Sequence, residues 1–203
     1  MKKILSCVLM LCLILMSACA FAEEPTDTAE TMEILPDFKS FYWGDSKETV
    51  VKTEGTPLHE GKMTALDAEY IVYETTAVGL DVLLGYYFCD DGLFQVRYIL
   101  TETHSNEALY INDYETFRDA LTKKYGKPLL DYENWTNDSK KNYYADDKGS
   151  ALCYGYLTYS TLYWTDRSCI QMGMSADNYD ITMTVDYNST EIDPGEADYS
   201  NDI

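Results

Sequence analysis

Six segments of the chain show the alternation of apolar and polar residues that is typical of antiparallel strands. In the third segment, Phe94 and Val96 fall on one face, whereas Gln95 and Arg97 fall on the other. The residues just before it, Cys89–Gly92, predict a hairpin turn. We therefore expect strands at about 70–73, 80–88, 93–101, 150–165, 168–175 and 179–187.

Two further segments predict helices. The first is expected to begin at Asp45, with Glu48 completing a capping box, and to end at Gly55. The second is expected to begin at Asn112 or Asp113. Its apolar face has the three- to four-residue spacing of a helix and is formed by Tyr114, Phe117, Leu121 and Tyr125.

A ten-residue segment around the end of the first helix recurs 71 residues later, as 49–58 and then as 120–129. Lysine, glycine, proline and leucine occupy the same places in both copies. The pattern predicts an α+β fold with one domain over 37–189, built from units at about 37–104 and 111–189. Each unit would be a helix followed by antiparallel strands, with both helices packed on one face of the sheet. The identities are also compatible with chance, because both segments share the same helix-stop chemistry.

The start of the chain, residues 1–22, reads as an export signal. Lys2 and Lys3 are followed by the apolar run Ile4–Met16, and Ala20–Ala22 fits the small-x-small rule for cleavage. The run is shorter than the span of about 20 residues that a membrane helix needs. We therefore expect a secreted or otherwise extracytoplasmic protein, with no transmembrane segment in the mature chain.

A second interpretation of the same region remains open. Residues 16–19 resemble the lipobox of bacterial lipoproteins, so Cys19 would become a lipid-bearing first residue that anchors the protein to a membrane. In either case, the acidic stretch 23–36 is expected to form a flexible lead, and the acidic stretch 190–203 a disordered tail.

Charge narrows the range of partners. The chain has 15 basic and 35 acidic residues; without Lys2 and Lys3, 13 basic residues face 35 acidic ones, for a net charge of −22. Such a field repels nucleic acids and anionic membranes. It favours solubility or a cationic partner, and it excludes nucleic-acid binding.

Three cysteines follow the signal, namely Cys89, Cys153 and Cys169. Three thiols allow at most one internal disulfide, for which Cys153 with Cys169 is the candidate pair. The alternative is that all three are reduced and buried, where cysteine packs as a small apolar residue.

The sequence contains none of the common catalytic or metal-binding motifs. The two histidines, His59 and His104, stand in no hydrolase signature, and neither paired CxxC motifs nor a calcium loop are present. We expect no catalytic residues, no metal and no cofactor, and therefore a non-enzymatic protein. A hydrolase with a cryptic site around either histidine is the least favoured alternative.

Tyrosine is unusually frequent, with 19 residues in the chain. Tyrosine suits a sheet face because the ring packs while the hydroxyl group remains in water. Three aromatic residues are the candidate contacts to a ligand or partner: Trp135, in an expected polar loop, and Tyr154 and Tyr156, on one expected strand face. These residues support an alternative function, a carbohydrate- or cell-wall-binding module.

The residues that lead into the first helix resemble a motif of known proteins. Trp43-Gly44-Asp45-Ser46, then Glu48, Val50 and Glu54-Gly55-x-Pro57, is similar to the opening of many exported bacterial proteins of unknown function. The strand-rich remainder resembles the small outer-membrane assembly lipoproteins in pattern, and the doubled unit resembles the two-repeat β-lactamase inhibitory proteins. The resemblance implies a helix-plus-sheet fold used for protein binding and transfers no individual residue. The expected partner is another extracellular or envelope protein.

Overall fold

The computed structural model describes residues 35–63 and 66–195. The chain divides into two compact units, Met1–Leu35 and Pro36–Ile203, and the fold described below belongs to the second. The predicted signal with Cys19, almost all of the predicted acidic lead and the last eight residues of the predicted tail lie outside the described residues.

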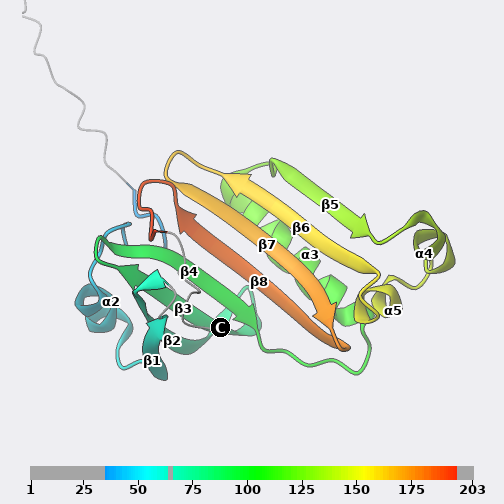
Figure 1. Cartoon of the computed structure of the whole chain (residues 1–203), viewed down its shortest axis with the longest axis horizontal. Helices are drawn as coiled ribbons and strands as arrows, with labels where there is room; N and C mark the ends of the chain where they lie inside the picture. The colour runs from blue at the N-terminus through cyan, green and yellow to red at the C-terminus, as the bar shows by residue number, and fades with distance from the viewer. Residues whose placement is uncertain (1–34, 64–65, 196–203) are drawn as a thin grey trace, which may run out of the picture. The chain divides into compact units, whose positions relative to one another are not determined.

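Eight antiparallel strands form one sheet in the order β1-β2-β3-β4-β8-β7-β6-β5 (Figure 1). Consecutive strands therefore pair throughout each half of the sheet, and the two halves meet where β4 pairs with β8. The strands are β1 His59–Met63, β2 Ala68–Ala77, β3 Leu80–Cys89, β4 Gly92–Leu100, β5 Leu130–Trp135, β6 Leu157–Trp164, β7 Ser168–Asp177 and β8 Asp180–Ser189.

Four helices accompany the sheet in the described part of the chain, which confirms the predicted α+β class. They are α2 Lys47–Glu54, α3 Ala108–Tyr125, α4 Asp138–Tyr143 and α5 Lys148–Cys153. The long helix α3 runs behind β6 and β7 in Figure 1. The six expected strands are present, although β6 begins at Leu157, because α5 occupies the start of the segment expected at about 150–165.

Strands β1 and β5 and helices α4 and α5 were not expected from the sequence. Strand β1 and helix α4 lie in polar segments, and β5 and α5 are too short to show a clear apolar period. Tertiary contacts rather than apolar periodicity therefore create these elements. Asn137 and Asp147 begin α4 and α5 by accepting hydrogen bonds from Lys140 N and Ser150 N, at 2.9 and 3.1 Å. Such caps allow six-residue helices to form in a loop-like sequence.

The two longer helices end as predicted but begin elsewhere. The first-turn amide of α2 is capped by Ser46, whereas Asp45 accepts a hydrogen bond from Tyr42 N at 2.9 Å. Helix α3 begins at Ala108, four residues before Asn112. The additional turn is ordered because Tyr110 and Ile111 pack against the core.

The aligned glycines of the recurring segment have the same role in the structure. Gly55 ends α2 with φ 93°, and Gly126 ends α3 with φ 81°. Three residues beyond each glycine, a leucine amide begins the pairing with the sheet. Leu58 N donates to Val72 O at 2.8 Å, and Leu129 N donates to Leu162 O at 2.7 Å.

The hydrophobic core covers one face of the sheet, and buried side chains of α3 belong to it. Tyr114 and Phe117 of α3 are buried there, and the Tyr114 hydroxyl group is 2.7 Å from that of Thr161. At α2, the buried Tyr86 donates to Glu54 at 2.6 Å. Tyrosine can fill the core at these two positions because each hydroxyl group has a hydrogen-bond partner, on β6 for Tyr114 and at the end of α2 for Tyr86.

The opposite surface of the sheet is called the outer face below. Residues that pair across neighbouring antiparallel strands share a face, so the strand registers identify its members. Its central part comprises Tyr70, Val72, Gly85, Tyr87, Gln95, Arg97, Ile99, Thr184, Asp186, Asn188, Cys169, Gln171, Gly173, Ser160, Leu162, Trp164, Leu130 and Tyr132.

Candidate functional site

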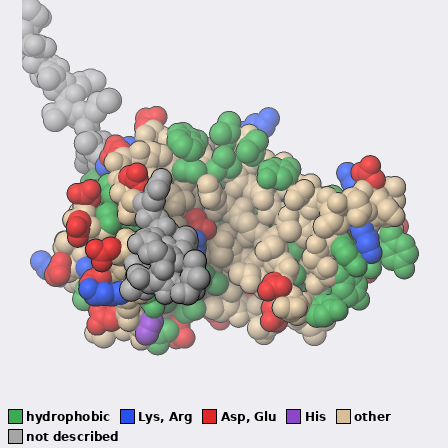
Figure 2. Space-filling view, viewed as in Figure 1, with side chains coloured by type: hydrophobic (Ala, Val, Ile, Leu, Met, Phe, Trp, Pro, Cys, Tyr) green, Lys and Arg blue, Asp and Glu red, His purple; other side chains and the backbone are tan. Residues whose placement is uncertain are grey.

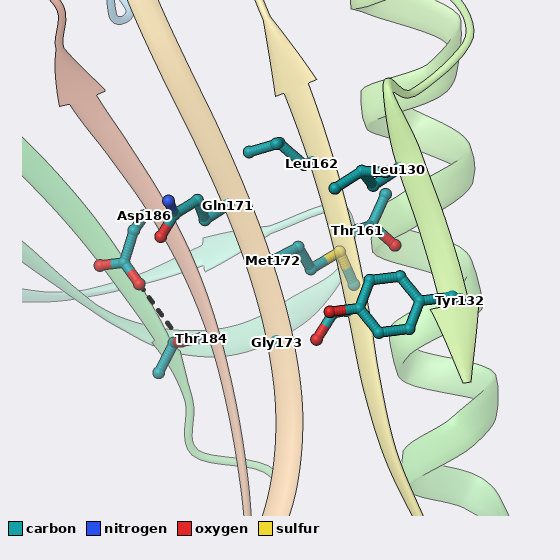
Figure 3. A pocket seen from close by; sticks show the side chains of 10 residues that line it. Leu130, Tyr132, Thr161, Leu162, Gln171, Met172, Gly173, Thr184 and Asp186 are labelled. Atoms are coloured by element: carbon teal, nitrogen blue, oxygen red, sulfur yellow. Dashed lines mark hydrogen bonds between the residues drawn. The ribbon is translucent and has the colours of Figure 1, made fainter. Parts of the chain in front are cut away.

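A hollow of about 330 Å³ lies on the outer face across β5, β6, β7 and β8 (Figure 3). Gly173 forms part of its floor, between Ser160 of β6 and Thr184 of β8. A Cβ atom built on Gly173 would have the Tyr159 carbonyl, at 3.9 Å, as its nearest neighbour. The surface is hollowed here because Gly173 has no side chain and its neighbours Ser160 and Thr184 have short polar side chains.

Apolar side chains border the hollow at the β5 edge. Leu130 and Tyr132 are each 51% exposed, and both reach over the hollow from β5. Trp164, the last residue of β6, is 60% exposed and pairs with Cys169 of β7. Large exposed side chains of this kind mark contact surfaces when they gather beside a concavity.

A polar group occupies the centre of the outer face, beside the hollow. The Arg97 side chain forms an ion pair with the nearly buried Asp186. Asp186 also accepts hydrogen bonds from Thr184 at 3.3 Å and from Gln95 at 3.4 Å, and Gln95 donates to Asn188 at 2.8 Å. These partners compensate for the burial of the carboxylate and hold Arg97 in one orientation.

The charge on this face differs from that of the whole chain. The Arg97 guanidinium group lies 5.9 Å from the ring of Tyr87, and burial raises the pKa of that phenol, so it remains neutral. Besides Arg97 and Asp186, the charged outer-face residues lie toward the β2–β3 and β7–β8 turns: Glu74, Asp81, Asp177 and Asp180. Figure 2 shows a central face with few charged side chains.

Trp135 is not in a loop, as the sequence had suggested, but is the last residue of β5. It is half-buried, packs against the core, and donates its indole hydrogen to Glu133 at 3.3 Å. Alternation along β5 places it on the helix side of the sheet, away from Tyr132 and the hollow.

Tyr154 and Tyr156 do not share a strand face either, because both precede β6 in the turn that follows α5. Their rings are 6.1 Å apart, so the structure does bring these two candidates together. Tyr154 is 50% exposed, whereas Tyr156 is half-buried, with the Lys140 ammonium group 3.8 Å from its ring centre.

The candidate Cys153–Cys169 disulfide is not formed, because the two residues lie near opposite ends of β7. The Cys153 thiol group is 3.8 Å from the Tyr179 carbonyl, in the turn that follows β7, whereas Cys169 is near the start of that strand. The strand separates them by about 26 Å, and a disulfide requires Cα atoms within about 7 Å. Cys89, Cys153 and Cys169 are free thiols.

No hydrogen bond joins a cysteine to a histidine within the described residues. Burial raises the pKa of the Cys153 and Cys169 thiols, which keeps them protonated. His104 pairs with Asp113 at 2.6 Å and packs edge-on against Tyr110, and His59 contacts the Tyr70 hydroxyl group at 3.3 Å. No three metal-ligating side chains come together within residues 35–63 and 66–195.

Sequence reasoning missed Trp164, Tyr132 and Arg97 as site residues. A signal for Trp164 was present, since β6 alternates strictly between buried and less buried positions, and Leu162 and Trp164 occupy the side that should be polar. A signal for Tyr132 was also present, since Leu130 and Tyr132 alternate with Asp131 and Glu133 along β5, although this alternation is only four residues long.

Comparisons with known proteins give no information on the site, so its interpretation rests on its geometry. The chain matches no protein-family model, no curated protein and no solved structure. In the described part of the chain, no helix has both the length and the apolar character needed to cross a membrane.

Proposed function

We propose that this protein is an exported, non-enzymatic binding protein whose outer face binds another protein of the envelope or the extracellular medium. One observation carries the proposal: the outer face is nearly uncharged at its centre and bears exposed aromatic side chains, in a chain with a net charge of −20. Protein interfaces have this composition, with charged residues depleted at the core and tyrosine, tryptophan and arginine enriched.

The arrangement suits a protein better than a small molecule. The hollow is shallow and opens onto a sheet surface that continues past Arg97 to Tyr87 and Tyr70. One projecting side chain of a partner would enter the hollow, and the surrounding sheet would cover the rest of the interface. Trp164, Tyr132 and Arg97 are the expected energetic anchors, since hot spots are enriched in these residue types.

The negative charge of the rest of the molecule indicates which charge the partner carries around its contact surface. A net charge near −20 attracts cations over a distance of the order of the Debye length and accelerates the approach of a positively charged protein. The proposed partner therefore has an apolar or aromatic centre, which meets the outer face, and a basic periphery.

We also propose that the domain is a duplication, with α2 and β1–β4 as one copy and α3 and β5–β8 as the other, each helix covering the same face. The aligned glycines and the equivalent leucine amides support this division. A superposition of the halves should place the helix ends and all four strands together. An alignment that fits only the helix ends would contradict it.

Export rests on residues 1–22 and has its own test. Intact mass of the native protein from medium and from membranes should show a chain that begins at Glu23. A diacylated chain that begins at Cys19, found in the membrane fraction, would replace secretion by the lipid-anchored alternative.

Affinity capture tests the binding proposal. The mature wild-type chain, the double variant Trp164→Ala/Tyr132→Ala and the control Leu58→Ala are used as baits on medium and envelope fractions. Leu58 is 60% exposed and lies beside α2, so its variant removes an equally exposed apolar side chain from another surface. We expect a protein that the wild type and control retain and the double variant loses. Retention by all three baits contradicts an outer-face site.

A further inference from the structure

A second cleft, of about 320 Å³, lies between the turn that follows α5 and the turn that joins β7 to β8. Tyr154, Tyr156 and Tyr179 line it, together with the polar side chains of Asp177 and Asn178. Trp164 pairs with Cys169, near the start of β7, whereas Asp177 is the last residue of that strand. The cleft therefore lies at the opposite end of β7 from Trp164.

Tyrosine rings converge around the cleft in a contiguous cluster. Tyr154 lies 5.9 Å from Tyr179 in an edge-to-face contact and 6.0 Å from Tyr144, which lies 4.7 Å from Tyr143. Tyr143 is 80% exposed, Tyr179 69% and Tyr154 50%. Hydrophobic side chains gather at this end of the molecule, over α4 and α5, in Figure 2.

The backbone at Tyr179 has a conformation that disfavours a side chain. Asn178 and Tyr179 form the β7–β8 turn with φ values of 48° and 71°, the left-handed pair in which glycine is ordinarily the second residue. The β2–β3 turn follows this rule, with Val78 at 51° and Gly79 at 86°. A strained position that carries a largely exposed ring points to a contact outside the chain.

The cleft is held in shape by contacts between its two walls. Gly155 has φ 70°, and its Cα is close enough to β7 that a Cβ atom would be 3.6 Å from the Ala176 carbonyl. The Cys153 thiol group contacts the Tyr179 carbonyl at 3.8 Å. A ligand would therefore meet a preformed surface and would not have to order one.

We infer that this cleft binds a sugar ring of a neutral glycan. The apolar C–H face of the ring would stack on Tyr179, and Tyr154, whose ring is at 83° to that of Tyr179, would contact the edge of the sugar. The sugar hydroxyl groups would bond to the Asp177 carboxylate and the Asn178 amide. The volume is at the lower end of the range for small-ligand pockets, about 300–1,000 Å³. Asp177 and the nearby Asp180 disfavour anionic sugars, and Tyr156 already has a cation, Lys140, on its ring.

Isothermal titration of the mature chain with neutral tetrasaccharides of glucose, mannose, galactose and N-acetylglucosamine tests this site. We expect one of the four to bind with a dissociation constant of about 1 mM or lower. Tyr179→Gly should weaken that binding at least tenfold while its melting temperature stays equal or rises, because glycine relieves the strained turn.

Val78→Gly is the matched control, since it makes a similar change in the other left-handed turn, and it should bind like the wild type. The inference is overturned if no tetrasaccharide binds, or if Tyr179→Gly binds as well as the control does. Loss of sugar binding in Tyr179→Gly with partner capture intact would separate this site from the outer face.

Discussion

At the scale of single residues, the close approach of two backbone segments makes Gly92 the most constrained position of the fold. Gly92 has φ 95°, and a Cβ atom there would be 2.3 Å from the Gly44 carbonyl oxygen. The two segments are joined by Gly44 N to Leu93 O at 3.0 Å and Leu93 N to Asp45 O at 2.9 Å. The tryptophan-glycine lead noted in the sequence thus docks onto the β3–β4 hairpin.

Gly92→Ala should therefore lower the free energy of unfolding by about 3 kcal/mol or more, because both the backbone angle and the contact oppose a side chain. Gly173→Ala is the control, since its nearest neighbour would be 3.9 Å away, and it should change stability by less than about 1 kcal/mol. Urea denaturation measures both. Equal losses in the two variants would show that the approach at Gly44 is not a constraint.

At this scale, the sequence indicated which residues are candidate contacts better than it indicated where those residues lie in the fold. Tyr154 and Tyr156 were selected from the sequence and do lie at a cleft, yet on a turn and not on a strand. Trp135 was selected because an indole in a polar segment is unusual, but its ring packs on the core. Whether an aromatic ring faces solvent depends on strand register, which a single sequence specifies weakly in a polar strand.

At the scale of elements, the packing of α5 against the start of α3 depends on one small residue. A Cβ atom at Gly149 would lie 2.7 Å from Ala108 N, a backbone atom that cannot rotate away. The first turn of α5 thus rests on the first turn of α3. This contact positions the turn that carries Tyr154 and Tyr156.

Gly149→Ala should lower the free energy of unfolding by about 2–4 kcal/mol, because α5 must move away from α3. Lys148→Ala, which removes a half-exposed ion pair to Glu133, should cost less than about 1 kcal/mol. Hydrogen exchange should show faster exchange at α5 amides in Gly149→Ala alone. Unchanged α5 protection would mean that the helix is held by other contacts.

Alternation and helix-stop chemistry predicted the longer elements, whereas tertiary contacts decided the short ones. Strand β4 and the ends of α2 and α3 could be predicted because periodicity and glycine caps act locally. Strands β1 and β5 were not predicted, because β1 is mostly polar, the alternation in β5 is short, and edge strands depend on pairing with their neighbours β2 and β6.

At the scale of the whole molecule, tyrosines in the core couple stability to alkaline pH. Burial raises the pKa of Tyr98 and of Tyr114 to about 12, and it also raises the pKa of Tyr86, Tyr159 and Tyr187. In the unfolded chain a tyrosine loses its proton near pH 10. The stability that the neutral phenols contribute is therefore complete below about pH 10 and is lost as the pH rises through 12.

We expect the free energy of unfolding to change little up to about pH 9 and to fall steeply above pH 10, by roughly 2 kcal/mol for each tyrosine that titrates only on unfolding. Urea titrations across this range, with tyrosinate absorbance followed in the same samples, measure it. Titration of all tyrosines near pH 10 in a protein that stays folded would contradict buried phenols.

The acidic surface predicts a salt-dependent encounter with the partner. The association rate should fall roughly tenfold between 0.01 M and 0.5 M salt, because screening removes long-range attraction, while the dissociation rate changes much less. Stopped-flow measurements with the captured partner test this. An association rate that rises with salt would mean that the partner is acidic and that the proposed basic periphery is wrong.

The most direct test of the outer-face site is the affinity of the purified captured partner for three forms of the mature chain. We predict that Trp164→Ala/Tyr132→Ala weakens binding at least about 30-fold, as the loss of hot-spot residues does, while its melting temperature stays close to that of the wild type. Leu58→Ala should bind within about twofold of the wild type. Equal affinity for all three forms would contradict the account, because binding would then not require the aromatic edge of the sheet.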